Sequence, residues 1–124
     1  MGNPFVHLEL VSTDVSKAKS FYGKLFDWRL EDVDVGDTTY TLIKAGDRKT
    51  AGGMMKNPSA DGHSMWIAYV QVASVKRATA KAKSLGAKIK KDVTKFKGLG
   101  SLSIIVDPTG ALLGLWEPRK NKKK

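Results

Sequence analysis

An imidazole and a carboxylate stand two residues apart near the start of the sequence, at His7 and Glu9. Residues 5–11 follow the alternating pattern that is typical of a β-strand, in which residues two apart point to the same face. A neighbouring carboxylate raises the basicity of an imidazole, so the pair has the chemistry of a proton acceptor or of a hydrogen-bonding hook for a ligand. A structural interpretation stands beside it, in which both side chains are hydrogen-bonded within a partly buried sheet.

A second alternating segment, residues 66–72, predicts another strand, with Ile67, Tyr69 and Gln71 on one face. The rings of Tyr69 and Trp116 are suited to stacking on a flat ligand, and equally to filling a core. Met54 is an adaptable apolar side chain that fits either packing or a pocket wall. These residues form the second group of candidate ligand contacts.

The elements that carry both groups belong to an internal repeat. A shift of 60 residues places Val15, Ala18 and Leu25 on Val75, Ala78 and Leu85. Each copy begins with a strand, continues into a helix with a cap residue before it, and is followed by three further strand candidates. Thr13 or Asp14 is expected to cap the first helix and Ser74 the second. The further strands are expected at residues 28–35, 38–44, 50–56, 88–93, 101–106 and 111–116.

The repeat predicts an α+β fold of two tandem βαβββ modules with mixed sheets. We expect a single domain over residues 1–118, with module one at 5–56, a linker at 57–64 and module two at 65–118; residues 119–124 are expected to be a disordered basic tail. With a helix on one face of each sheet, the other faces would together form a concave ligand cavity. An offset of 62 residues after the helices aligns Gly52 with Gly114 and puts both glycines on this face. The expected lining residues are Phe5, His7, Glu9, Gly52, Met54, Ile67, Tyr69, Gln71, Gly114 and Trp116.

Composition and charge exclude several classes of protein. The 124 residues contain no cysteine, which excludes a disulfide scaffold, a cysteine metal site and a thiol nucleophile. No stretch is long and apolar enough for a membrane span, so we expect a soluble, cytoplasmic protein. The net charge of +10 is concentrated in residues 88–97 and 119–124. Because no nucleic-acid-binding motif accompanies these basic runs, they are read as solvated surface, and a nucleic-acid partner is the most distant alternative.

Two stretches of the sequence are similar to a known family. Phe5-Val6-His7-Leu8-Glu9-Leu10, followed by Phe21-Tyr22-Gly23-Lys24-Leu25-Phe26-Asp27-Trp28, resembles the opening of the glyoxalase/bleomycin-resistance/dioxygenase group, the vicinal oxygen chelate superfamily. Asp107-Pro108-Thr109-Gly110-Ala111, followed by Leu115-Trp116-Glu117-Pro118, resembles its closing hairpin. The resemblance implies a glyoxalase-like fold and a homodimer, and it is strongest to the branch related to lactoylglutathione lyase.

The resemblance also implies a divalent metal held by histidine or glutamate on the first and last strand of each module. The matching positions are His7, Gly52 (Gly53 if the register slips by one), Ile67 and Gly114. Three of these four positions have no donor atom, and one imidazole does not hold a divalent ion against water. We therefore expect no metal cofactor, no lactoylglutathione lyase activity and no extradiol dioxygenase activity.

Two functions remain for the predicted cavity. The first is metal-free binding of a small organic molecule through His7, Glu9, Met54, Ile67, Tyr69, Gln71 and Trp116. The alternative is a lyase- or isomerase-type enzyme that acts on a small carbonyl or aromatic substrate without a metal or with an atypical one, with His7 or Glu9 as the base. The sequence leaves open whether the protein is an enzyme.

Overall fold

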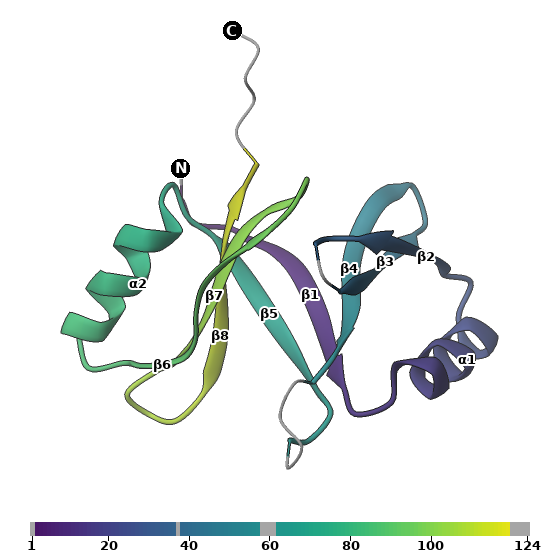
Figure 1. Ribbon diagram of the computed structural model, residues 1–124, viewed down its shortest axis with the longest axis horizontal. Helices are drawn as coiled ribbons and strands as arrows, with labels where there is room; N and C mark the ends of the chain where they lie inside the picture. Colours follow the sequence, from purple (N-terminus) through teal and green to yellow (C-terminus); the bar gives the residue numbers. More distant parts are fainter. Residues whose placement is uncertain (1, 37, 58–61, 120–124) are drawn as a thin grey trace, which may run out of the picture. The chain divides into compact units, whose positions relative to one another are not determined.

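The computed structural model describes residues 2–36, 38–57 and 62–119 (Figure 1). The chain forms two successive βαβββ copies, as the repeat predicts. The first copy consists of β1 (Phe5–Ser12), α1 (Val15–Leu25), β2 (Arg29–Asp34), β3 (Thr39–Ala45) and β4 (Arg48–Lys56). The second consists of β5 (Met65–Gln71), α2 (Val75–Ser84), β6 (Lys88–Phe96), β7 (Gly100–Val106) and β8 (Leu112–Pro118). The α+β class and the mixed sheets are confirmed; residues 58–61 of the expected linker and 120–124 of the expected tail lie outside the described residues.

The chain divides into two compact units whose boundaries fall inside β1 and β5. The first unit is His7–Ile67, and the second consists of Met1–Val6 together with Ala68–Lys124. In the first unit the strands follow the order β2-β3-β4-β1, with β1 parallel to β4. In the second they follow the order β5-β8-β7-β6, with β5 parallel to β8. Within the described residues, no helix is long and apolar enough to cross a membrane.

Helix α1 begins at a capped end and packs a partly buried face against the first unit's sheet. The Asp14 side chain accepts a hydrogen bond from the Lys17 amide at 3.0 Å, so of the two cap candidates it is Asp14 that caps the helix. Leu10, Ile43 and Met54 form the buried centre under the helix. The partly buried residues packed against them are Val15, Ala18, Tyr22, Trp28 and Leu30. Leu25, which the repeat aligns with Leu85, is 56% exposed and lies outside this core.

Helix α2 is built in the same way on the second unit. Ser74 caps it as predicted by accepting from the Arg77 amide, and Gly86 follows it with a φ of 105°, a conformation that glycine adopts without strain. Its buried core consists of Val72, Val75, Ile105 and Leu115. The carboxylate of Glu117 accepts from the Val75 amide at 2.9 Å, which ties the end of β8 to the first turn of the helix.

The predicted position of Met54 is wrong, and so is that of Gly52. In the observed register β4 pairs with β3 through Ile43–Gly52 and Leu42–Gly53, and the pairing shifts at an irregularity between Ile43 and Ala45. Gly53 pairs with Glu9, as Gly114 pairs with Tyr69. The offset in the last strand is therefore 61 residues rather than 62, and this one-residue change moves Gly52 and Met54 to the opposite face.

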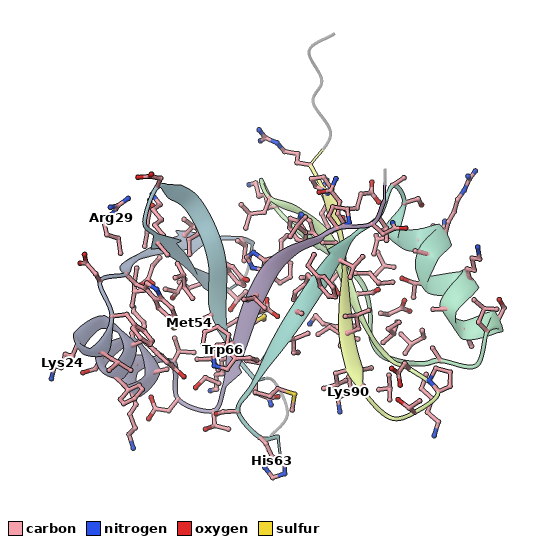
Figure 2. All side chains as sticks on the ribbon, turned by 180° about the vertical axis from the view of Figure 1, so that it is seen from behind. Lys24, Arg29, Met54, His63, Trp66 and Lys90 are labelled. Atoms are coloured by element: carbon pink, nitrogen blue, oxygen red, sulfur yellow. The ribbon has the colours of Figure 1, made fainter. Side chains whose placement is uncertain are left out.

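Met54 accordingly lies between the strands and α1, fully buried (Figure 2). Replacement by alanine removes a core side chain and leaves a cavity, so we expect Met54→Ala to lower the free energy of unfolding by about 2–5 kcal/mol. Guanidinium denaturation followed by circular dichroism measures the change. The neighbouring Met55→Ala is the matched control, because Met55 is only partly buried. Equal losses for the two variants would contradict the observed register.

Candidate functional site

A hydrogen-bonded chain of three side chains lies on the face of the first unit's sheet opposite α1. The Tyr40 hydroxyl, from β3, donates to Glu9 Oε2, from β1, at 2.9 Å. His7 Nε2 lies 2.8 Å from the same hydroxyl oxygen. Because the single phenolic proton is directed at the carboxylate, His7 Nε2 is assigned as the protonated nitrogen that donates to Tyr40. The predicted pair of His7 and Glu9 is therefore brought together, with Tyr40 as the bridge between them.

Burial makes these hydrogen bonds important. Glu9 is 1% exposed and Tyr40 is 3% exposed. A buried polar group without a partner costs free energy, and a buried carboxylate costs more than a neutral group. Among the described residues every buried side-chain nitrogen or oxygen has a hydrogen-bond partner. The trio is thus part of a satisfied polar network in a largely apolar sheet.

Burial also determines the charge state of His7. Desolvation of the imidazole lowers the pKa of His7 from 6.5 to about 4. The ring is therefore neutral at neutral pH, and its donation through Nε2 to Tyr40 places the single proton of the neutral ring on that nitrogen. A group with this pKa is a weak base at pH 7, which makes His7 a hydrogen-bonding residue rather than an efficient proton acceptor there.

Tyr40 was missed by the sequence analysis, although the strand that carries it was predicted. Its ring covers Gly53, where an added Cβ would overlap the ring atoms. Gly53 therefore leaves the space that lets the phenol lie flat on β4 and reach Glu9 and His7. The signal in the sequence was the alternation of residues 38–44, which puts Tyr40 on the face opposite Ile43.

The second unit brings together Tyr69, Gln71 and Trp116. Tyr69 pairs with Gly114 across β5 and β8, and Gln71 pairs with Trp116. The Tyr69 ring covers Gly114, so there too a glycine makes room for an aromatic ring, and Tyr69 is 1% exposed. Trp116 is half-buried and lies over Gly100.

The remaining predicted residues differ in their surroundings. Ile67 is buried on β5, within the first unit. Phe5 is 73% exposed. Met54 is separated from the trio by the thickness of the sheet, since it packs under α1.

The described donor set does not fit the metal that the family resemblance implies. Within residues 2–36, 38–57 and 62–119, no group of three histidine, cysteine, aspartate or glutamate side chains is placed to hold an ion. The last-strand positions that align with the expected ligands are Gly53 and Gly114, which have no side-chain donor. The two donors that are close together, His7 and Glu9, both hydrogen-bond the Tyr40 hydroxyl.

Comparison with known proteins gives consistent family and fold matches. The family model for the Glyoxalase/Bleomycin resistance protein/Dioxygenase superfamily matches residues 5–115. A protein of Mycobacterium tuberculosis that carries a provisional glyoxylase name, CFP32, is 30% identical over 118 residues, which cover 92% of this chain and 45% of that protein. The chain spans about half the length of the curated relatives it matches.

Two solved structures share the fold at low sequence identity. The hypothetical protein BH1468 of Bacillus halodurans superposes with a TM-score of 0.68 and 13% identity, with all of both chains covered. The methylmalonyl-CoA epimerase of M. tuberculosis superposes with a TM-score of 0.66 and 14% identity, covering 94% of this chain and 88% of the other. At these identities the likeness concerns the fold.

The lowered pKa of His7 predicts a pH dependence of stability. Because the folded-state pKa of about 4 lies below the unfolded value of 6.5, the unfolded chain binds more protons between these values. The contribution of His7 to stability is complete above about pH 6.5 and is lost as the pH falls through about 4. We expect wild type to lose more stability over this range than His7→Gln, as measured by denaturant unfolding at several pH values.

The chain offers a matched control in its second histidine, His63, which is exposed at the far end of the connection before β5 (Figure 2). The His63→Gln variant should keep the wild-type pH profile. It also identifies which of the two imidazole NMR signals belongs to His7, whose midpoint is expected near pH 4. A His7 midpoint near 6.5, or an unchanged profile in His7→Gln, would contradict the burial argument.

Proposed function

Because the chain belongs to the Glyoxalase/Bleomycin resistance protein/Dioxygenase superfamily, we propose that it binds a small organic molecule without a metal ion, at the sheet face that carries His7, Tyr40 and Glu9. The observation that carries the proposal is the hydrogen-bonded chain of these three side chains, with contacts of 2.8 and 2.9 Å. Its imidazole, phenol and carboxylate are groups that fix the orientation of polar ligands in mostly apolar sites.

The contrast between the two halves of the repeat supports a role beyond packing. The residue that corresponds to Glu9 in the second unit is Tyr69, which covers its glycine with an aromatic ring. The second unit thus shows that this sheet face can be packed with aromatic and aliphatic side chains and does not need a buried carboxylate at this position. Keeping a carboxylate at 1% exposure in the first unit costs desolvation free energy, and recognition of a polar ligand explains that cost.

The donor chemistry supports binding without a metal. His7 and Glu9 share a hydroxyl partner, and Gly53 and Gly114 stand where the resemblance expects ligands. An ion bound by an imidazole and one carboxylate would compete with water at its remaining positions. The proposed ligand is accordingly held by hydrogen bonds and apolar contacts alone.

Tyr40→Phe tests the binding proposal most directly, because it removes the bridging hydroxyl and keeps the ring over Gly53. A thermal-shift screen of small carboxylic acids, carbonyl compounds and aromatic molecules first identifies stabilising compounds, and isothermal titration then measures their affinities. We expect Tyr40→Phe to weaken binding by about tenfold, the value of one hydrogen bond to a charged or polar group. Tyr22→Phe is the matched control, since the Tyr22 hydroxyl contacts Trp66 Nε1 on the α1 side of the sheet.

Treatment with a chelator distinguishes metal-free binding from metal-dependent binding of the ligand. Binding should be unchanged after dialysis against EDTA, and the protein offered Ni, Zn, Mn or Fe(II) in turn should retain none after dialysis. One retained ion per chain that is lost in His7→Ala would overturn the metal-free assignment. Equal affinities in wild type and Tyr40→Phe would overturn the assignment of the site.

A second candidate function is metal-independent proton transfer with Glu9 as the base. The hydrogen bond from Tyr40 to Glu9 favours it, because a phenol can relay or balance charge on a carboxylate that exchanges a proton. An epimerase is among the proteins that share the fold. His7 is a weaker candidate because its pKa is about 4.

Proton exchange in deuterated water tests this second candidate. Compounds with an acidic C–H next to a carbonyl or thioester are incubated with the protein, and deuterium incorporation is followed by NMR. Catalysis by Glu9 predicts incorporation that is lost at least 100-fold in Glu9→Gln, in keeping with the usual contribution of a general base. His63→Gln should keep the wild-type rate. Incorporation that persists in Glu9→Gln, or none above the uncatalysed rate in wild type, excludes this role.

A further inference from the structure

The second unit contains a cavity of about 560 Å³ where β6 and β8 end and β7 begins. Its wall includes three cationic side chains, Lys95, Lys97 and Arg119, and one carboxylate, Glu117. The volume falls within the range of about 300–1,000 Å³ that is usual for small-molecule sites. These residues lie in the second unit, whereas His7, Glu9 and Tyr40 lie in the first.

The backbone holds the three cations around this cavity. The turn after β6 is closed by a hydrogen bond from the Leu99 amide to the Phe96 carbonyl at 2.9 Å, with Gly98 at a φ of 81°. The Arg119 amide donates to the Leu99 carbonyl at 3.0 Å, which fastens the end of β8 to this turn. The backbones that carry Lys95, Lys97 and Arg119 are thus joined by β-ladder and turn hydrogen bonds.

Acidic side chains among the described residues do not balance the cationic charge of the cavity. Glu117, its one carboxylate, accepts from the Val75 amide at 2.9 Å, so it is engaged by the partial positive charge of the α2 N-terminus. The ion pairs among the described residues are Lys19–Asp32 and Lys44–Glu31, both in the first unit. In the part of the chain that the structure describes, Lys95, Lys97 and Arg119 therefore have no carboxylate partner.

The distribution of charge along the chain reinforces the local excess. Residues 7–67 contain eight lysines and arginines against nine acidic residues, whereas the rest of the chain contains fourteen against three. The second unit therefore carries a net charge of +11 and the first unit a net charge of −1. A one-signed field around a concave site raises the local concentration of ligands of the opposite charge.

We propose that this cavity binds the phosphate or diphosphate group of a small organic molecule. Three cations around one opening match a group that carries at least two negative charges and several acceptor oxygens. Arginine supplies paired N–H donors that fit phosphate oxygens, and lysine supplies compact point charges. A single carboxylate ligand would leave most of the cationic charge unbalanced. This site is independent of the one proposed in the first unit.

Inorganic pyrophosphate is the probe for the first experiment, with isothermal titration as the readout on the full chain. We expect saturable binding of one pyrophosphate per chain. The variant Lys95→Ala/Lys97→Ala/Arg119→Ala should bind at least about tenfold more weakly. The matched control is Lys81→Ala/Lys83→Ala/Lys88→Ala, which removes the same charge at exposed positions outside the cavity and should bind like wild type.

A second readout does not depend on the folding of any variant. Addition of pyrophosphate to the wild-type protein should shift the NMR amide signals of Gly98 and Gly100, which line the cavity, more than those of Gly36 or Gly46 in the first unit. Inorganic phosphate and a phosphate-containing nucleotide then show whether one or two phosphate groups are preferred.

Four results would overturn the proposal. The first is the absence of saturable pyrophosphate binding, and the second is an equal loss of affinity in the cavity variant and the control variant. The third is a set of NMR shifts that is spread evenly over the basic surface. The fourth is displacement of pyrophosphate by a short single-stranded oligonucleotide, if both triple variants bind that oligonucleotide more weakly than wild type does. The last result would identify the basic surface as a polyanion-binding surface instead, with the steep salt dependence of phosphate-backbone contacts.

Discussion

The buried carboxylate of Glu9 is the constraint around which the first unit is arranged. A carboxylate that is 1% exposed must be hydrogen-bonded, and the structure meets this need with a phenol from a strand that is not its neighbour in the sheet. The phenol reaches Glu9 only because the strand between them carries Gly53, which leaves room for the ring. The arrangement therefore depends on three residues together: Glu9 on β1, Tyr40 on β3 and Gly53 on β4.

The second unit shows how the same scaffold is completed without that constraint. Tyr69 stands where Glu9 stands in the first copy and lies on Gly114, so the ring and the glycine are retained while the ring comes from a different strand. The two copies thus differ in the polarity of this sheet face and in net charge. One has a polar face opposite its helix and almost no net charge, and the other has an aromatic face and most of the cationic charge.

Most of the fold could be predicted because each element has a local signal. The caps at Asp14 and Ser74, the alternating strands and the turn glycines all act over a few residues. The positions of the site residues were harder to predict, because they depend on the register between neighbouring strands. Met54 and Gly52 were placed on the wrong face because the irregularity between Ile43 and Ala45 leaves no mark in a hydrophobic pattern. Tyr40 was missed for a related reason: its partners lie 31 and 33 residues away, and only the sheet brings them together.

The hydrogen bond between Glu117 and the first amide of α2 has a consequence for the order in which the second unit is completed. The group that caps this amide lies 42 residues further along the chain. Ser74 caps α2 from the adjoining residue, whereas the acceptor for the Val75 amide is supplied only when β8 is in place. The last strand therefore finishes a helix as well as a sheet. Proteolytic loss of the segment from Trp116 onward would loosen the start of α2, far away in the sequence.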